Sequence, residues 1–336
     1  MLGLPDPSIV RSLSFYTAEP QFSFWTFMAG KEPLVYIDGE YHPKGSAKIS
    51  VYDHGLLYGD GVFEGIRAYN GIVFHLREHI ERLLEGLRIT RINITLSREE
   101  LMNAVVETLR KNNFMDSYIR LVVTRGRGNL GLDPRSASKS SVIIMTEPVA
   151  PAHGREAREK GITAIISSYR RDMVDGTTHE LKSLNYIQSV LAKFQAIDAG
   201  TDEVVMLDHR GMVSEFHGSN LFMIKQGAVH TPTSASGILH GITRSRVLKL
   251  AEELGYDVHE RDITPYELLN ADEVFLTGTM AEIVPVIKIQ GVMIADGKPG
   301  PVTREIIRSF QRITQDPKEG RMIREQVPVP ARARTN

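Results

Sequence analysis

The sequence predicts an α/β (α+β) fold with a smaller N-terminal domain and a larger C-terminal one. Three observations support this. The length of 336 residues suggests about two domains. Residues 34–147 combine strand patterns with two amphipathic helices, and residues 160–316 contain a second series of short strands and helices. Between them, residues 148–159 carry prolines, a glycine and charges without a hydrophobic period, which predicts an interdomain linker.

Composition indicates an ordinary globular protein, with 42% hydrophobic and 24% charged residues. A net charge of -1 gives no support for nucleic acid or an anionic membrane as the main partner. The absence of cysteine excludes disulfides, thiolate catalysis and cysteine-ligated metal. The first 15 residues lack the features of a signal peptide, and no stretch approaches the ~20 apolar residues of a membrane span. We therefore expect a cytoplasmic location.

The first domain is predicted from strand and helix patterns. Residues 1–33 have no sustained period and are expected to be an N-terminal extension. Two strands in LVYIDGEYH surround an Asp38-Gly39 turn, and AKISVYD predicts a third. Ser97 and Glu100 form a capping box that opens a helix. The remaining elements are a helix at 78–87 with a buried face of Ile80, Leu83, Leu84 and Leu87, and strands at 118–124 and 141–147.

The second domain is predicted as a meander of short strands with helices between them. A helix after Lys182 has Asn185 as a candidate N-cap. Its apolar residues recur at intervals of three and four, which predicts a buried face of Ile187, Val190, Leu191, Phe194 and Ile197. Strands are predicted at 161–168, 203–208, 212–218, 220–225, 228–232, 272–278 and 282–289, and helices at 241–255 and 300–310. Residues 317–336 are predicted to be a polar tail.

Lys182 is unusual because it stands immediately before a helix N-terminus, where the helix dipole disfavours positive charge. A solvated loop lysine is the commoner explanation for any single lysine. The alternative is a site that lowers the pKa of the amine so that it can act as a nucleophile.

Several other segments carry candidate site residues. Gly241, Ile242 and Thr243 begin a helix, and Thr279 belongs to the turn TGTMAE, so both segments could bind a phosphate through exposed N–H groups. Ordinary capped turns are the alternative for both. Arg82 lies off the apolar stripe of its helix and is either a third phosphate ligand or a solvated arginine.

Two strands place charged side chains where a ligand could bind. Glu215 shares a strand face with Val213 and His217, and a buried carboxylate there must be paired. Tyr118 and Arg120 share a face of their strand, which suggests a carboxylate ligand or an edge-strand charge.

Two further site types find no support. GRGNLG at 126–131 fits G-x-G-x-x-G, but LDPRSASKS follows instead of a helix, so a nicotinamide site is not expected. No cluster has metal-ligand spacing.

In order along the chain, these motifs resemble the fold-type IV pyridoxal-phosphate aminotransferases, and most closely the branched-chain amino acid aminotransferases. The segments that carry the resemblance are VYDHGLLYGDGVFEGIRAYNG, EHIERL, YIRLVVTRG, LKSLNY, SEFHGSNLF, GITR and TGTMAEIVPV, within residues 34–312. The resemblance implies a small α/β domain, a larger cofactor-binding domain with a pseudo-barrel of short strands, and pyridoxal 5'-phosphate as cofactor.

The resemblance also assigns residues. Lys182 matches the lysine that forms the Schiff base and shuttles the proton, and Glu215 matches the partner of the pyridine nitrogen. The other cofactor-binding positions match Arg82, Tyr186, Leu239, Ile242, Thr243 and Thr279. The substrate pocket matches Phe63, Gly65, Arg67, Tyr118, Arg120, Met280 and Ala281. Residues that match contributions from a neighbouring subunit are Tyr58, Leu130 and Leu132, which implies a homodimer and leaves a higher oligomer open.

The reaction implied is ping-pong transfer of the amino group of L-leucine, L-isoleucine or L-valine to 2-oxoglutarate. A D-amino acid or (R)-amine transaminase, or an aminodeoxychorismate lyase, is an alternative on the same fold. The pattern departs from the family where Phe216 replaces the glycine after the glutamate and His217 follows, and where PVAPAHG replaces a tryptophan-bearing stretch. Both departures bear on which substrates the chain accepts, and not on its cofactor.

Overall fold

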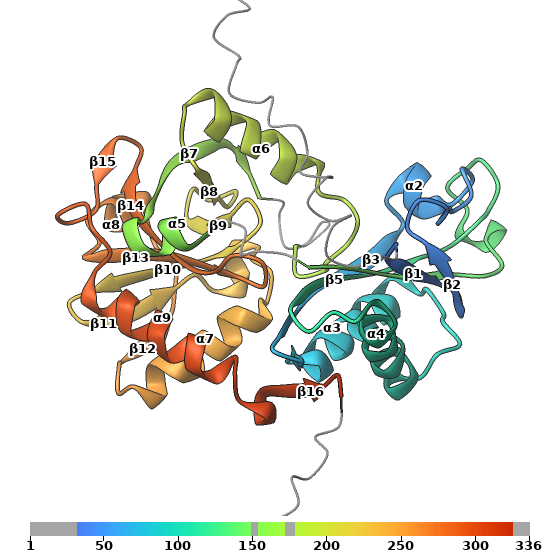
Figure 1. The fold of residues 1–336 in the computed structure, drawn as a ribbon. Coiled ribbons are helices and arrows are strands. Elements are labelled where there is room, and N and C mark those ends of the chain that lie inside the picture. The colour runs from blue at the N-terminus through green and yellow to red at the C-terminus, as the bar shows by residue number, and fades with distance from the viewer. Residues whose placement is uncertain (1–31, 149–153, 172–178, 325–336) are drawn as a thin grey trace, which may run out of the picture.

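The computed structural model describes residues 32–148, 154–171 and 179–324 (Figure 1). One sheet has seven strands. In spatial order, these are β16 (Gly320–Met322), β4 (Ile72–Phe74), β3 (Gly61–Tyr69), β5 (Ser117–Thr124), β6 (Ser141–Glu147), β1 (Leu34–Ile37) and β2 (Glu40–Pro43). Three helices accompany it, α2 (His54–Tyr58), α3 (Leu76–Thr90) and α4 (Arg98–Asn112).

The first core forms where α3 and α4 pack on this sheet. Ile80 and Leu83 of α3 meet Leu101 and Leu109 of α4 and the inward face of β3 and β5. The predicted capping box of Ser97 and Glu100 is confirmed at the start of α4. The Asp38-Gly39 hairpin is confirmed as well, with both turn residues at positive φ.

The strand predicted in AKISVYD is wrong. Residues 47–50 have no regular structure, and Val51 and Tyr52 form an exposed turn. Asp53 instead caps α2, because its carboxylate accepts hydrogen bonds from the N–H of Gly55 and the hydroxyl of Thr124. The side-chain cap bends the chain at the point where the alternating pattern predicted extension.

The second sheet has nine strands and curls into a half-barrel (Figure 1). In chain order, they are β7 (Ile162–Arg170), β8 (Glu203–Leu207), β9 (Val213–Phe216), β10 (Asn220–Lys225), β11 (Ala228–Thr231), β12 (Val258–Glu260), β13 (Glu273–Gly278), β14 (Glu282–Ile289) and β15 (Val292–Met293). Its helices are α5 (Gly154–Lys160), α6 (Ile187–Asp198), α7 (Ile242–Glu253), α8 (Pro265–Leu269) and α9 (Pro301–Ile313). The predicted α/β fold with a pseudo-barrel of short strands is confirmed.

The helix after Lys182 differs from its prediction in two ways. Asn185 is not its N-cap, because α6 begins at Ile187 and Asn185 donates to the carbonyl of Gly59. The predicted buried face is exposed, with relative exposures from 38% to 68%. The side that packs against β8 consists of small residues, Ser189, Ala192 and Ala196. A hydrophobic period identifies the apolar face of a helix, but it does not show whether other residues of the same chain bury that face.

Residues 317–324 are not a free tail. β16 pairs with β4 in the first sheet, and Ile323 is buried in the first core. Residues 1–31, 149–153 and 325–336 lie outside the described part, so most of the predicted extension and tail, and the middle of the predicted linker, are not described. α5 occupies the end of the predicted linker. We propose domain bounds of 34–147 and 160–316, with β16 returning to the first domain.

Across the three described ranges, none of the helices combines the length and apolar character that crossing a membrane requires.

Candidate active site

A cavity of about 530 Å³ lies between the two sheets. Its walls come from β3 and β5 on one side, and from β9, β13 and the start of α7 on the other. The structure brings most of the predicted site residues into this wall. They are Phe63, Gly65, Arg82, Tyr118, Arg120, Lys182, Tyr186, Glu215, Leu239, Ile242, Thr243, Thr279 and Met280.

Lys182 is held at the cavity by the segment that precedes α6. Its carbonyl accepts from the N–H of Phe63, so the segment runs beside β3. Its Nζ lies 3.2 Å from the hydroxyl of Tyr186 and 4.5 Å from the ring centroid of Phe63. Burial, followed by the charges of Arg82 and Arg120, lowers the pKa of Lys182 to about 8. The position therefore favours a neutral amine at mildly alkaline pH.

Glu215 is a buried carboxylate at the end of β9 that lies in the same cavity. One of its oxygens, Oε2, accepts from Asn220 Nδ2 at 2.9 Å and from the N–H of Leu239 at 3.2 Å. The other, Oε1, lies 3.1 Å from Arg171 Nη2. Burial raises the pKa of Glu215 and Arg171 opposes the rise, so the ion pair helps to keep the carboxylate ionised.

Arg171 is a site residue that the sequence patterns did not predict. It follows β7 and is 3% exposed. Besides Glu215, its guanidinium donates to Ser189 Oγ at 3.1 Å and to the carbonyl of Phe216 at 3.0 Å. The only sequence signal was a pair of arginines at the end of a strand, a pattern that is also common on solvated loops.

Glu64 was missed for a different reason. It lies on β3 facing α3, where alternation places core residues, and it is completely buried. Its carboxylate binds Arg82 through Nε and Nη2 at 2.7 Å each and His79 Nδ1 at 2.7 Å. Although burial raises the pKa of Glu64, the charges of Arg82 and His79 outweigh it and lower the pKa to about 2. Arg82 is thus a fixed cation at the cavity and not a solvated surface arginine.

The start of α7 offers an anion site. α7 begins at Ile242 with Gly241 as N-cap, and no side chain caps its N–H groups. A Cβ at Gly241 would lie 2.0 Å from Asn220 Oδ1, so only glycine fits this approach. Arg82 Nη1 donates to the carbonyl of His240 at 2.6 Å, which brings its charge to the same place. Thr277 Oγ1 is buried here without a hydrogen-bond partner among the described residues. These groups fit a phosphate.

The opposite wall of the cavity combines a cation with aromatic rings. Arg120 and Tyr118 share a face of β5, as predicted, and the Arg120 guanidinium carbon lies 4.5 Å from the Phe63 ring centroid and 5.5 Å from that of Tyr118. At Gly65, a Cβ would approach the Tyr118 hydroxyl to 2.4 Å, so a glycine is needed for this ring to reach the wall.

Five predicted residues do not line the cavity of their own chain. Arg67 is buried further along β3, with its guanidinium carbon 5.2 Å from the Tyr69 ring centroid. The cavity therefore gives no support to the prediction that Arg67 belongs to the substrate pocket. The same holds for Ala281, which does not line the cavity either. Tyr58 accepts a hydrogen bond from the N–H of Gly131 at 2.7 Å. Leu130 and Leu132, in the same loop, are 73% and 80% exposed.

The structure shows the place of the side chain of Phe216, which replaces the family's glycine after the glutamate. The ring of Phe216 is fully buried in the core of the half-barrel and does not line the cavity. His217 does line it, as do other residues that were not predicted. The remaining unpredicted residues are Arg171, His179, Leu184, Gly218, Ser219 and Asn220, whereas Gly241, Thr277 and Gly278 belong to the two predicted phosphate-binding segments.

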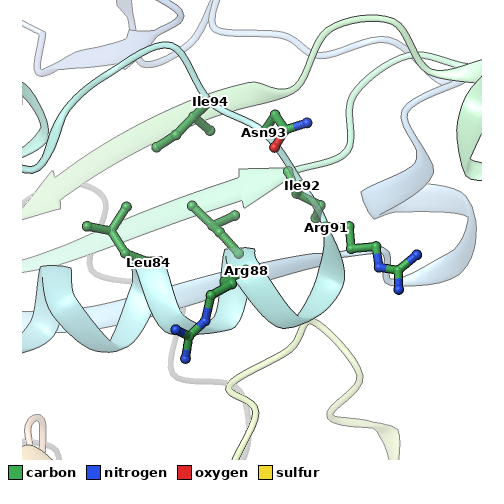
Figure 2. Close-up of a pocket in the computed structure, with 7 residues that line it drawn as sticks. Leu84, Arg88, Arg91, Ile92, Asn93 and Ile94 are labelled. Atoms are coloured by element: carbon green, nitrogen blue, oxygen red, sulfur yellow. The ribbon is translucent and has the colours of Figure 1, made fainter.

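A smaller cavity of about 370 Å³ lies at the C-terminal end of α3. Figure 2 shows Leu84 and Ile94 gathered at it, whereas the guanidinium groups of Arg88 and Arg91 point away from them. Its lining has no carboxylate and none of the predicted site residues, so we assign the chemistry to the larger cavity. In the described ranges, no group of three or more His, Asp or Glu side chains is placed to hold a metal ion.

A half-buried lysine of lowered pKa, a buried carboxylate and an uncapped helix N-terminus thus meet in one cavity, as expected of an enzyme with a phosphorylated aldehyde cofactor. Residues 61–289 match the family model of class IV aminotransferases. The chain belongs to this family, and the predicted enzyme class and pyridoxal-phosphate dependence are confirmed.

Named relatives agree with the family match. A putative branched-chain-amino-acid aminotransferase of Methanocaldococcus jannaschii is 50% identical over 279 residues, 83% of this chain and 96% of the relative. The crystal structure of the Escherichia coli branched-chain amino acid aminotransferase has a TM-score of 0.82 at 38% identity, covering 84% of this chain and 95% of that chain. The branched-chain amino acid aminotransferase of Thermobaculum terrenum, crystallised in its PLP form, has a TM-score of 0.77 at 29% identity, covering 84% of this chain and 94% of that chain.

Proposed function

We propose that this aminotransferase transfers the amino group of L-leucine, L-isoleucine and L-valine to 2-oxoglutarate by a ping-pong mechanism. The names of its relatives support the branched-chain substrate class. The observation that carries the proposal is the placement of Lys182, with its lowered pKa, in one cavity with Glu215 and the start of α7. Pyridoxal phosphate supplies the electron sink for the exchange of amino groups.

Lys182 is the residue that holds the cofactor and later moves a proton. A neutral amine is needed for both steps, and burial beside two arginines favours that form. The hydroxyl of Tyr186 lies 3.2 Å from Lys182 Nζ and would donate a hydrogen bond to the phenolic oxygen of the cofactor. Glu215, kept ionised by Arg171, holds a proton at the ring nitrogen.

The phosphate is held at the start of α7. Ile242 and Thr243 offer N–H groups there, and Arg82 supplies a cation whose direction Glu64 fixes. Thr279 follows β13 on the same wall, and Leu239, which also lines the cavity, would pack on the cofactor ring. Together these residues would hold the cofactor in the cavity that Lys182 lines.

The substrate side chain lies on the wall formed by β3 and β5. Phe63 and Tyr118 offer apolar surface for an isobutyl group, and Arg120 between them offers donors for the γ-carboxylate of glutamate or 2-oxoglutarate. Gly65 leaves room for Tyr118, and Met280 closes the wall near Thr279.

We also propose a homodimer with shared active sites. Tyr58 hydrogen-bonds the loop that carries Leu130 and Leu132, and both leucines are exposed and do not line the cavity of their own chain. Exposed leucines on a loop with an anchored base are suited to complete the cavity of a second copy. The exposed apolar face of α6 offers further area for contact between copies.

The test is the identity of the lysine that holds the cofactor. Borohydride reduction of the loaded protein, followed by peptide mass spectrometry, should place the cofactor on Lys182. A Lys182→Ala variant should bind no reducible cofactor, whereas Lys193→Ala, a matched change in α6, should bind it normally. Label on another lysine, or a chain that pyridoxal phosphate cannot reconstitute, would contradict the proposal.

A further inference from the structure

A second buried acidic residue lies next to the Arg171–Glu215 pair. Glu203, the first residue of β8, is almost fully buried, and its Oε2 lies 2.7 Å from His217 Nδ1. A buried carboxylate fixes the ring nitrogen that faces it as the hydrogen-bond donor. The ring of His217 is therefore held in one orientation, and His217 lines the cavity.

His217 is fixed through its main chain as well. Its N–H donates to the carbonyl of Val204 at 3.2 Å, so the backbone and the ring are both anchored to the first two residues of β8. The preceding residue, Phe216, donates its N–H to the carbonyl of Ser219 at 2.8 Å, which closes a tight turn. The carbonyls of residues 216 and 217 thus have little freedom.

These two carbonyls bind the arginine that pairs with Glu215. Arg171 Nη2 donates to the carbonyl of Phe216 at 3.0 Å and to that of His217 at 3.3 Å, and it lies 3.1 Å from Glu215 Oε1. One guanidinium nitrogen therefore connects the turn at 216–219 to the carboxylate. A shift of the turn would change the direction in which Arg171 meets Glu215.

We propose that the Glu203–His217 pair positions Arg171 and, through it, the Glu215 carboxylate, so that His217 is a positioning residue for the cofactor ring. The inference rests on the proposed role of Glu215 at the ring nitrogen. The nitrogen of His217 that matters is Nδ1, which faces Glu203, and not Nε2. A contact between Nε2 and the bound molecule is the competing explanation.

Two amide variants separate the two explanations. The amide of His217→Asn occupies the place of Nδ1 and can still donate to Glu203, whereas the amide of His217→Gln reaches the place of Nε2. We expect His217→Ala and His217→Gln to raise the dissociation constant of pyridoxal phosphate about tenfold, and His217→Asn to restore most of the affinity. Equal affinity in all three variants, or rescue by glutamine and not by asparagine, would overturn the proposal.

A second readout reports on the cofactor ring directly. With ¹⁵N-labelled pyridoxal phosphate bound at neutral pH, the ring-nitrogen resonance of the wild type should be that of a protonated ring. In His217→Ala and Glu203→Leu it should move toward the unprotonated position, and in His217→Asn it should stay. An unchanged resonance in His217→Ala and Glu203→Leu would contradict a positioning role.

Controls keep this test independent of the fold and of the proposed function. His217→Ala and Glu203→Leu should be non-additive in affinity, since they remove the same contact. His42→Asn changes a histidine paired with Glu40 on β2, away from the cavity, and should have no effect. Borohydride labelling of Lys182 in every variant shows that the proposed function holds even where the positioning role fails. If His217→Ala does not fold, the comparison of His217→Asn with His217→Gln still distinguishes the two explanations.

Discussion

The guanidinium of Arg82 and the carboxylate of Glu64 meet through two hydrogen bonds of 2.7 Å each, inside the packing of α3 on β3. Glu64 is completely buried, and His79 contacts the same carboxylate. The cation that we assign to the cofactor phosphate is thus fixed by a core residue that does not line the cavity. Bidentate pairing sets the plane of the guanidinium as well as its place.

Replacing Glu64 by glutamine should therefore weaken cofactor binding. We expect Glu64→Gln to raise the dissociation constant of pyridoxal phosphate about tenfold or more, because a neutral amide cannot hold both nitrogens of Arg82. The change should also lower the thermal stability of the apoprotein, since it leaves a buried charge without its partner. Glu81→Gln, which alters an exposed pair with Arg98, is the matched control and should bind normally. Normal affinity in Glu64→Gln would show that Arg82 does not need this carboxylate.

Lys182 should react with aldehydes at an unusually low pH. Because its pKa is lowered from 10.5 to about 8, the neutral and nucleophilic form should predominate above pH 8 in the apoprotein. The rate of reductive methylation of Lys182 in the apoprotein, followed by mass spectrometry, should rise with pH and reach half its maximum near pH 8. The exposed Lys160 in the same digest should keep an alkaline midpoint, because its pKa is raised by Glu156. A shared midpoint for both lysines would contradict the assigned environment.

Arg120→Met should separate the two substrates. We expect the Michaelis constant for 2-oxoglutarate to rise about ten- to a hundredfold, the loss of a charge-assisted hydrogen bond of ~1.5–3 kcal/mol. The half-reaction with L-leucine, followed by the absorbance of the bound cofactor without an acceptor, should change far less. Arg88→Met, in the smaller cavity at the end of α3, is the control.

Two results with Arg120→Met would contradict this prediction. Equal losses in both half-reactions would mean that Arg120 binds the α-carboxylate or supports the fold. No change in either would remove Arg120 from substrate recognition.

The shared active site predicts complementation between inactive variants. Lys182→Ala removes the cofactor lysine, and Leu132→Asp should impair the site that its loop completes in the partner. Unfolding and refolding the two variants together should restore up to about a quarter of wild-type activity, because half of the random dimers then contain one intact site out of two. Activity no greater than the sum of the separate variants would contradict a site shared through Leu132.

Sequence patterns correctly predicted features that a few neighbouring residues define, such as a helix cap or a turn. The capping box of Ser97 and Glu100, the turn at Asp38-Gly39 and the start of α7 at Gly241 depend on residues close together in the chain, so local chemistry settles them. Lys182 and Glu215 were found through their motifs, and the fold brings them into one cavity.

The errors occurred where distant residues decide the outcome. Arg171 gains its partners only when β7 and β9 enter the same sheet, and Glu64 depends on the packing of α3. The apolar face of α6 was predicted to be buried, but small residues on the other side pack against β8. Likewise, nothing in residues 320–322 reveals that β4, far back in the sequence, leaves an edge to which they can pair.

In the proposed reaction, 2-oxoglutarate receives the amino group of a branched-chain L-amino acid. One panel tests it most directly: both enantiomers of leucine and alanine, and both enantiomers of 1-phenylethylamine, each supplied with 2-oxoglutarate, with glutamate formation as the readout. We predict that L-leucine is the best donor of the panel, with D-leucine and (R)-1-phenylethylamine near background. Faster glutamate formation from a D-amino acid or the (R)-amine would contradict the account and assign the chain to the other stereochemical class of transaminases on this fold.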